Sequence, residues 1–233
     1  MRTFVALLVK EEKAIFTTPI AYVVIAVFLL IMGYTFTLTL FMSHTASLVH
    51  VFFQIYVLFL LTVPIITMRL IAEERRLRTL EVLLTAPVSE VAVILSKYLA
   101  SMSLITVMLL LSGVYAITLA IFGQPDWGPI FSGYLGLLLH ASALVAVGLL
   151  ASCLVSNQIV AAVMSLSLFL LLWIIDKLGY LLPDPFNALV VNMSFLVHFR
   201  TFATGSLFLS DAGFFISVAL LGLFLSIRAL GQR

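Results

Sequence analysis

The sequence predicts an all-α, polytopic membrane protein with six transmembrane helices and a charged helix between the second and third of them. Hydrophobic residues make up 64% of the chain and charged residues only 9%, whereas about a quarter of the residues in a soluble domain are charged. Residues 14–68, 98–125 and 127–175 contain no Asp, Glu, Lys or Arg, and a helical span needs only about 20 apolar residues. The first and third tracts each have room for two spans. With the second tract and the apolar C-terminal segment, we expect one six-span domain over residues 1–233.

The first 18 residues predict a short amphipathic helix that lies in the membrane interface. Apolar residues recur there at helical spacing and the charged residues fall on the other face; the apolar ones are Phe4, Leu7, Leu8 and Ile15. Pro19 follows, and proline is well tolerated at the first position of a helix. We therefore expect the first span over residues 20–42.

The second span, residues 49–67, contains Pro64. Proline removes one backbone hydrogen bond and tends to kink a helix. The kink would lie next to the charged segment, where Pro64 could serve as a hinge. A tolerated bend without a functional role is an equally open interpretation.

Residues 69–90 form the charged segment, and the run 68–90 holds eight of the chain's charged residues. Leu77, Leu80 and Leu84 fall on one helical face. Glu74, Arg78 and Glu81 on another face offer ion pairs three and four residues apart. The pattern predicts a cytoplasmic helix between spans two and three.

The third span is predicted to start after this segment. Pro87 ends the charged helix, and Ser89 is a suitable N-cap for the next one. Lys97 follows, and its side chain could extend to the lipid headgroups. We expect this helix to end near Phe122.

Two further spans and a polar region lead to the last span. The fourth span, residues 130–155, contains pairs of small residues four apart, which let helices approach closely in lipid; they are Ser142 with Ala146 and Gly148 with Ser152. The fifth span covers residues 159–175. Residues 176–211 predict short extracytoplasmic helices with an interfacial phenylalanine anchor, and Ser210-Asp211 would cap the sixth span, residues 212–230.

The basic residues predict the orientation. Six spans place both termini on one side, and ten of the twelve Lys and Arg residues fall on that side. Cytoplasmic loops carry the excess of Lys and Arg. We therefore expect a multi-pass protein of the cytoplasmic (inner) membrane with both termini in the cytoplasm.

Several kinds of chemistry have no sequence support. The chain contains neither G-x-x-x-x-G-K-[ST] nor H-E-x-x-H, and no predicted span contains two carboxylates. We expect no cofactor bound by this chain, and the net charge of +2 gives no reason to expect a nucleic-acid partner. His140 is interpreted as a hydrogen-bonded packing residue. Met42, His44 and His50 are spaced too irregularly to predict a metal site.

Two stretches carry a resemblance to a known family. The run from Thr67 to Ser101, TMRLIAEERRLRTLEVLLTAPVSEVAVILSKYLAS, resembles the membrane subunits of ABC exporters of the type V fold, and in particular the gliding-motility permease branch. It is also similar to the permease of the nitrous-oxide-reductase maturation system. The run from Val191 to Phe215, VNMSFLVHFRTFATGSLFLSDAGFF, resembles the segment before the last span in that branch.

The resemblance implies that residues 69–90 are a coupling helix that docks on a separate ATPase subunit, which binds ATP and Mg. From the charged segment and the uncharged spans we expect homodimers, or heterodimers with a similar permease, that enclose a pathway lined chiefly by spans two and five. Whether an extracytoplasmic accessory protein binds residues 176–211 is left open by the sequence. Family members usually carry glycine where this chain has Arg78 and Ser96. The residues implied to contact the ATPase are Glu73, Glu74, Arg75, Arg76, Thr79, Leu80, Glu81, Leu83 and Leu84.

Three other functions stay open from the sequence. An ion-coupled carrier or channel would use ionisable groups inside the membrane, but the predicted spans are nearly free of them. A membrane anchor for an ATPase, without transport, would have the same charged segment. A membrane-bound enzyme would need catalytic groups near one interface, and the candidates are Asp176, Lys177, Asp184, His198 and Arg200.

Overall fold

The computed structural model describes residues 2–43, 47–79, 88–179, 181, 183 and 186–231. Within this part, six helices are long and apolar enough to cross a membrane, which confirms the predicted fold class. They are α2 (Pro19–Ser43), α3 (Val49–Thr67), α6 (Glu90–Phe122), α7 (Trp127–Leu154), α8 (Gln158–Gly179) and α11 (Leu209–Gly231). The shorter helices are α1 (Arg2–Thr17), α4 (Ala72–Arg76), α9 (Phe186–Val191) and α10 (Phe195–Ala203).

Most predicted helix ends follow from local capping. The Ser89 hydroxyl accepts a hydrogen bond from the Ala92 amide at 3.3 Å and α6 ends at Phe122, both as predicted. The predicted cap of the last span is wrong: α11 begins at Leu209, and Asp211 lies in its first turn. There the Asp211 carboxylate is bound by side chains of α10, so it is not available as a cap.

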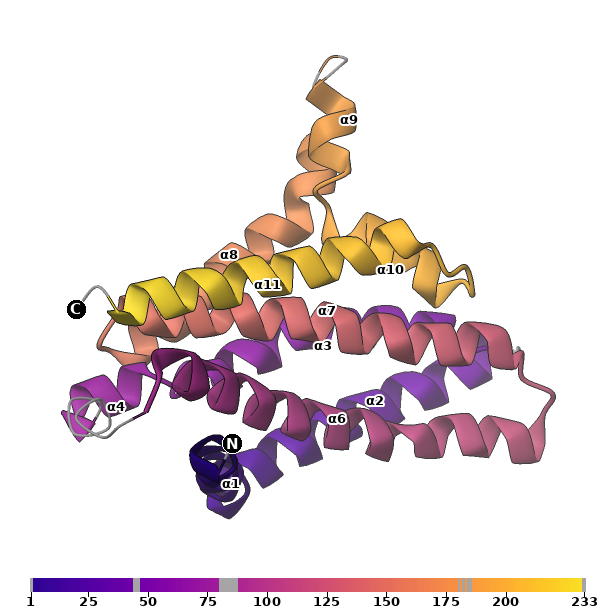
Figure 1. The fold of residues 1–233 in the computed structure, drawn as a ribbon. Helices are drawn as coiled ribbons and strands as arrows, with labels where there is room; N and C mark the ends of the chain where they lie inside the picture. Colours follow the sequence, from indigo (N-terminus) through magenta and orange to yellow (C-terminus); the bar gives the residue numbers. More distant parts are fainter. Residues whose placement is uncertain are drawn as a thin grey trace.

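Helix α7 lies at the centre of the bundle. It packs against α3, α6, α8, α10 and α11, and Figure 1 shows it running between α3 and α11. Helix α7 can lie close to α3 because it carries small residues on the contact face: an added Cβ on Gly148 would lie 2.4 Å from the Thr67 hydroxyl oxygen. At the contact with α11, an added Cβ on Gly222 of α11 would lie 3.0 Å from the backbone of Ala146 of α7. The small-residue positions predicted in the fourth span are therefore packing positions.

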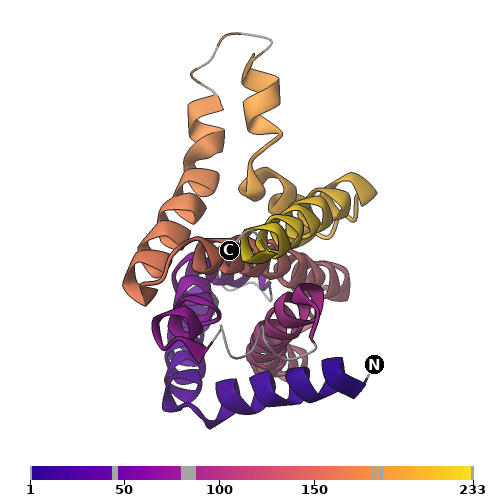
Figure 2. The same cartoon turned by 60° about the vertical axis from the view of Figure 1, so that its left-hand side comes forward.

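Two elements depart from the bundle axis. Helix α1 runs across one end of the bundle and packs on α6 and α2 (Figure 2), in agreement with the predicted N-terminal amphipathic helix. Helix α8 begins against α7 and α3, and its later part projects from the bundle together with α9 in both views (Figures 1 and 2). The start of α6 and the end of α11 are neighbours, since an added Cβ on Gly231 would touch the Glu90 carboxylate. The end of the bundle that carries α1 and α4 thus also carries the end of α11.

Candidate functional site: the charged segment

The charged segment leaves α3 and is held against the end of α7. Helix α3 continues past Pro64 and ends at Thr67. The Ser152 hydroxyl of α7 then accepts hydrogen bonds from the amides of Ile71 at 3.1 Å and Ala72 at 3.0 Å. The Arg75 Nη1 atom donates to the carbonyl oxygen of Cys153 at 2.6 Å. These bonds fix the start of α4, since free amides at a helix start need an acceptor.

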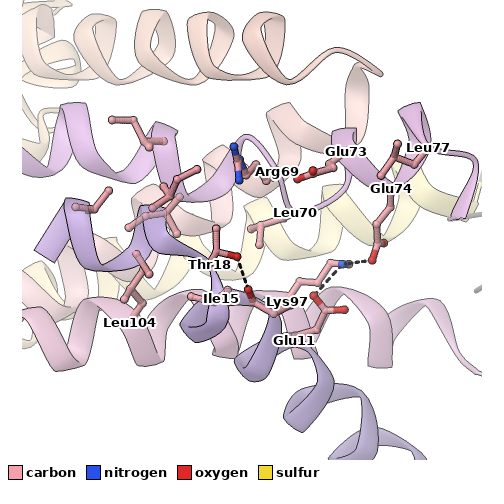
Figure 3. A pocket seen from close by; sticks show the side chains of 16 residues that line it. Glu11, Ile15, Thr18, Arg69, Leu70, Glu73, Glu74, Leu77, Lys97 and Leu104 are labelled. Atoms are coloured by element: carbon pink, nitrogen blue, oxygen red, sulfur yellow. Dashed lines mark hydrogen bonds and ion pairs between the residues drawn. The ribbon is translucent and has the colours of Figure 1, made fainter.

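A cluster of four charged residues joins α4 to two other helices; we call it the ion cluster, formed by Lys10, Glu11, Glu74 and Lys97. Lys97 Nζ of α6 lies 3.0 Å from Glu11 Oε2 of α1 and 2.8 Å from Glu74 Oε1 of α4. Lys10 Nζ lies 3.3 Å from Glu11 Oε1 and 3.5 Å from Glu74 Oε1. Figure 3 shows Lys97 between the two carboxylates. The two cations balance the two anions.

Two predictions about these residues are wrong. Lys97 is only 1% exposed, so its side chain does not extend to the headgroups: it turns inward because two carboxylates provide partners there. The expected pair between Glu74 and Arg78 also does not form. The Glu74 carboxylate instead pairs with Lys97 and Lys10, and α4 ends before Arg78.

The charge of Lys10 is stabilised by the cluster. Partial burial acts to lower the pKa of Lys10, but the carboxylates of Glu11 and Glu74 outweigh it and raise the pKa above the ordinary value of 10.5. A raised lysine pKa stabilises the folded state at all pH values below the ordinary one. The contribution is lost only as the pH rises through the raised pKa.

The predicted ATPase contacts divide into an inner and an outer group. Glu73, Glu74 and Arg75 are half-buried, whereas Arg76 and Thr79 are exposed. Leu77, between them, is 61% exposed. The predicted contacts Leu80, Glu81, Leu83 and Leu84 lie outside the described residues, as do all of residues 80–87 of the predicted coupling segment.

Arg78 follows α4 in a left-handed backbone conformation, with φ of 57°. Side chains with a Cβ disfavour this region and glycine does not. The position is one at which the resembled family usually carries glycine. Arg78 thus occupies a glycine-type turn with a side chain that is exposed.

The comparison with protein families decides the class of this molecule. The model of the ABC-2 family transporter protein matches residues 37–196, well over half of the chain. The chain belongs to the ABC-2 transporter family. No curated protein matches it. An ABC-2 permease is a membrane subunit that is generally non-catalytic and works with ABC ATPase subunits.

The opposite end of this ABC-2 permease holds a second polar group. His198 Nδ1 lies 2.8 Å from Asp211 Oδ1, and His198 Nε2 lies 2.9 Å from the Asn192 carbonyl oxygen. Thr201 donates to the other Asp211 oxygen. Both ring nitrogens of His198 are occupied, so this group ties α10 to α11 and offers no nitrogen for proton abstraction. Among the other enzyme candidates, Arg200 is exposed on α10 and Lys177 on α8, and Asp184 lies outside the described residues.

The phenylalanine-rich run serves the core of the permease rather than its interface. Phe195, Phe199 and Phe202 are at most 2% exposed, while Phe208 is 56% exposed. The prediction of an interfacial anchor is therefore wrong for three of the four rings. They are buried because α10 folds back onto α7 and α11.

His140 of α7 is fully buried against this aromatic group. Its ring stacks on Tyr56 with centroids 4.2 Å apart and meets Phe195, Phe199 and Phe215. Within the described part of the chain neither ring nitrogen forms a hydrogen bond of regular geometry, although the Tyr56 backbone lies close enough to interact with the imidazole. His140 is thus a packing residue, as predicted, and its ring contacts four aromatic residues.

The metal candidates do not gather into a site that the structure describes. Among the described residues, no three His, Cys, Asp or Glu side chains come together. Met42 and His50 line one shallow surface pocket, and His44 lies outside the described residues.

Sequence reasoning missed three residues of the permease's charged end: Lys10, Glu11 and Ser152. One signal was available for the first two. Lys10 and Glu11 lie close before a charge-free tract of 55 residues, 14–68, and Lys97 directly before another, so both signs of charge occur at the same predicted membrane boundary. Ser152 gave no comparable signal, because serine is common on helix-packing faces in membranes.

Proposed function

We propose that this permease is the membrane-spanning subunit of an ATP-driven ABC exporter, and that hydrolysis by a separate ATPase drives translocation across it. The observation that carries the proposal is the division of the charged segment. Its outer residues, Arg76 to Thr79, are exposed, while Glu74 and Arg75 are bonded into the bundle. A partner that moves the exposed group would also move the buried one.

The ion cluster supports a mechanical role for this segment. Lys97 joins α1, α4 and α6 through two carboxylates, and Ser152 joins the start of α4 to α7. A displacement of α4 by an ATPase would therefore reach three other helices: α1 and α6 through charge-assisted bonds, and α7 through the hydrogen bonds of Ser152. Pro64, four residues before Met68, would allow α3 to bend during this movement, since the α3 helix lacks one hydrogen bond there.

The proposal includes an assembly and an orientation. The permease would work as a homodimer or with a similar permease, in the inner membrane, with both termini in the cytoplasm. The two spans least buried in the protomer are α8 and α2, of which 17% and 22% are buried. They offer the area for a second copy. The two motifs at Thr67–Ser101 and Val191–Phe215 support placement near the gliding-motility permease branch.

The test is a pull-down of the tagged chain from its native membrane in nanodiscs, with mass spectrometry and an ATPase assay. We expect a stoichiometric ABC ATPase subunit with the wild type. Reversing both exposed cations, in Arg76→Glu with Arg78→Glu, should lower its recovery roughly tenfold, because two interfacial charges change sign. Arg200→Glu is the matched control, since Arg200 is an exposed cation at the other end of the bundle.

Two results would overturn the proposal. One is the absence of any ATPase from the wild-type complex; solute movement in liposomes without ATP would then support an ion-coupled carrier. The other is full recovery of the ATPase by the double variant. An ATPase that co-purifies but whose hydrolysis moves no solute would support a non-transporting anchor.

A further inference from the structure

A cavity of about 360 Å³ lies beside the ion cluster, within the range of about 300–1,000 Å³ that is typical of ligand pockets. We call it the interfacial pocket. Helices α1, α2, α3, α4 and α6 contribute to its walls. Its wall on α2 adjoins a span of which only 22% is buried, so the pocket borders the lipid-facing side of the protein.

The pocket is apolar at one end and charged at the other. Apolar residues from three spans line the deep part: Ile20, Ala21, Val24, Ile65, Ile66 and Leu104. In Figure 3, Leu104 lies at one side of the pocket, Glu73 and Glu74 lie at the other, and Arg69 lies between them. Leu104 is seven residues beyond Lys97 along α6, hence about 10 Å deeper into the bundle.

Two buried polar atoms of the lining have no hydrogen-bond partner among the residues that the structure describes. They are Arg69 Nε and Glu74 Oε2, and each such group costs free energy unless a ligand or water binds it. Arg69 requires an acceptor, and Glu74 Oε2 requires a donor. A ligand that satisfies both must carry an anionic or acceptor group and a donor group beyond it.

We infer that the interfacial pocket binds one membrane phospholipid of the phosphatidylethanolamine type. In such a lipid the order is acyl chain, glycerol, phosphate and primary ammonium. The pocket presents, in the same order, apolar residues, the Arg69 guanidinium and the carboxylates of Glu73 and Glu74. The guanidinium suits a phosphate, and the primary ammonium donates hydrogen bonds that a quaternary choline group cannot make.

The lipid would connect the end of α3 to α4 at this end of the bundle. Its phosphate would bind Arg69, two residues after the end of α3, and its ammonium would bind α4, next to the contacts of Glu74 with Lys97 and Lys10. This site requires neither an ATPase nor export, so its test is independent of the proposed function.

The experiment is native mass spectrometry of the full chain in detergent, titrated separately with dioleoyl phosphatidylethanolamine, phosphatidylglycerol and phosphatidylcholine. We expect one phosphatidylethanolamine molecule to be retained at the lowest lipid concentration. Arg69→Gln should shift that titration roughly tenfold, the loss expected for one charge-assisted hydrogen bond. Ala21→Leu should shift it as well, because Ala21 is buried on the pocket wall and the larger side chain fills it.

Two matched controls separate the pocket from general lipid contact. Arg228→Gln removes an exposed cation at the same end of the bundle, and Ala26→Leu enlarges an exposed residue of α2; both should bind as the wild type does. Equal binding of the three lipids would overturn the headgroup assignment. Unchanged binding by Arg69→Gln and Ala21→Leu would overturn the site. Should Arg69→Gln fail to elute as one species, Ala21→Leu decides alone.

Discussion

Among single residues, Lys97 has the largest expected effect on stability. It is buried between two carboxylates, and removal of one member of a buried ion pair leaves an uncompensated charge. Lys97→Met should lower the free energy of unfolding by about 3–5 kcal/mol, measured by chemical denaturation in detergent micelles.

A triple variant tests whether the loss of stability comes from the uncompensated charges. Lys97→Met with Glu11→Leu and Glu74→Leu should recover most of the lost stability, because buried ion pairs are often replaceable by apolar residues of similar volume. Lys10, left without these partners, has a side chain that is 55% exposed, so its charge stays hydrated. A triple variant as unstable as Lys97→Met would contradict this account of the cluster.

His140 should tolerate replacement by another aromatic residue but not by a small one. His140→Phe keeps the ring contacts with Tyr56 and Phe199 and removes two buried nitrogens for which no described residue provides a hydrogen bond of regular geometry. We expect an unchanged or higher melting temperature, whereas His140→Ala should cost roughly 2–5 kcal/mol through the cavity it leaves. Loss of transport by a stable His140→Phe protein would show that the imidazole has a role beyond packing.

At the scale of elements, α7 owes its central position to its small residues. An added Cβ on Gly148 would lie 2.4 Å from Thr67 Oγ1, so α3 would have to move. Gly148→Ala should therefore cost about 1–3 kcal/mol, the usual range for overpacking.

Gly113 of α6 is the matched control for Gly148. Among the described residues, and apart from its own helix backbone, no atom lies within 4 Å of an added Cβ there, and alanine is a better helix former than glycine by about 1 kcal/mol. Gly113→Ala should therefore be neutral or stabilising, and thermal unfolding in detergent measures both this variant and Gly148→Ala. Equal destabilisation by both substitutions would show that the close approach of α7 and α3 is not the cause.

At the scale of the whole molecule, the predicted orientation has a direct test. Lys13 of α1 and Arg200 of α10 are exposed, and the native Cys153 is buried. With a membrane-impermeant maleimide, Arg200→Cys should react in intact cells and Lys13→Cys only after lysis. The unmodified chain serves as the background, and the reverse pattern would place the termini outside.

The sequence by itself determined the six spans, the amphipathic first helix and the start of α6 at Ser89. These features are local: within lipid, each span must satisfy its backbone hydrogen bonds internally, so composition over about 20 residues is sufficient to locate it. The charged segment was recognised for the same reason, since its composition differs from that of its flanks.

Only the tertiary structure decided which charged residues face inward. Lys97 meets Glu11, which lies 86 positions earlier, and Ser152 meets the amides of Ile71 and Ala72. The sequence alone favoured headgroup contact for Lys97, because a lysine at a span boundary has that option whenever no buried carboxylate is near. Whether a carboxylate is near depends on how α1, α4 and α6 pack, and contacts between distant segments leave no periodic signal in either of them.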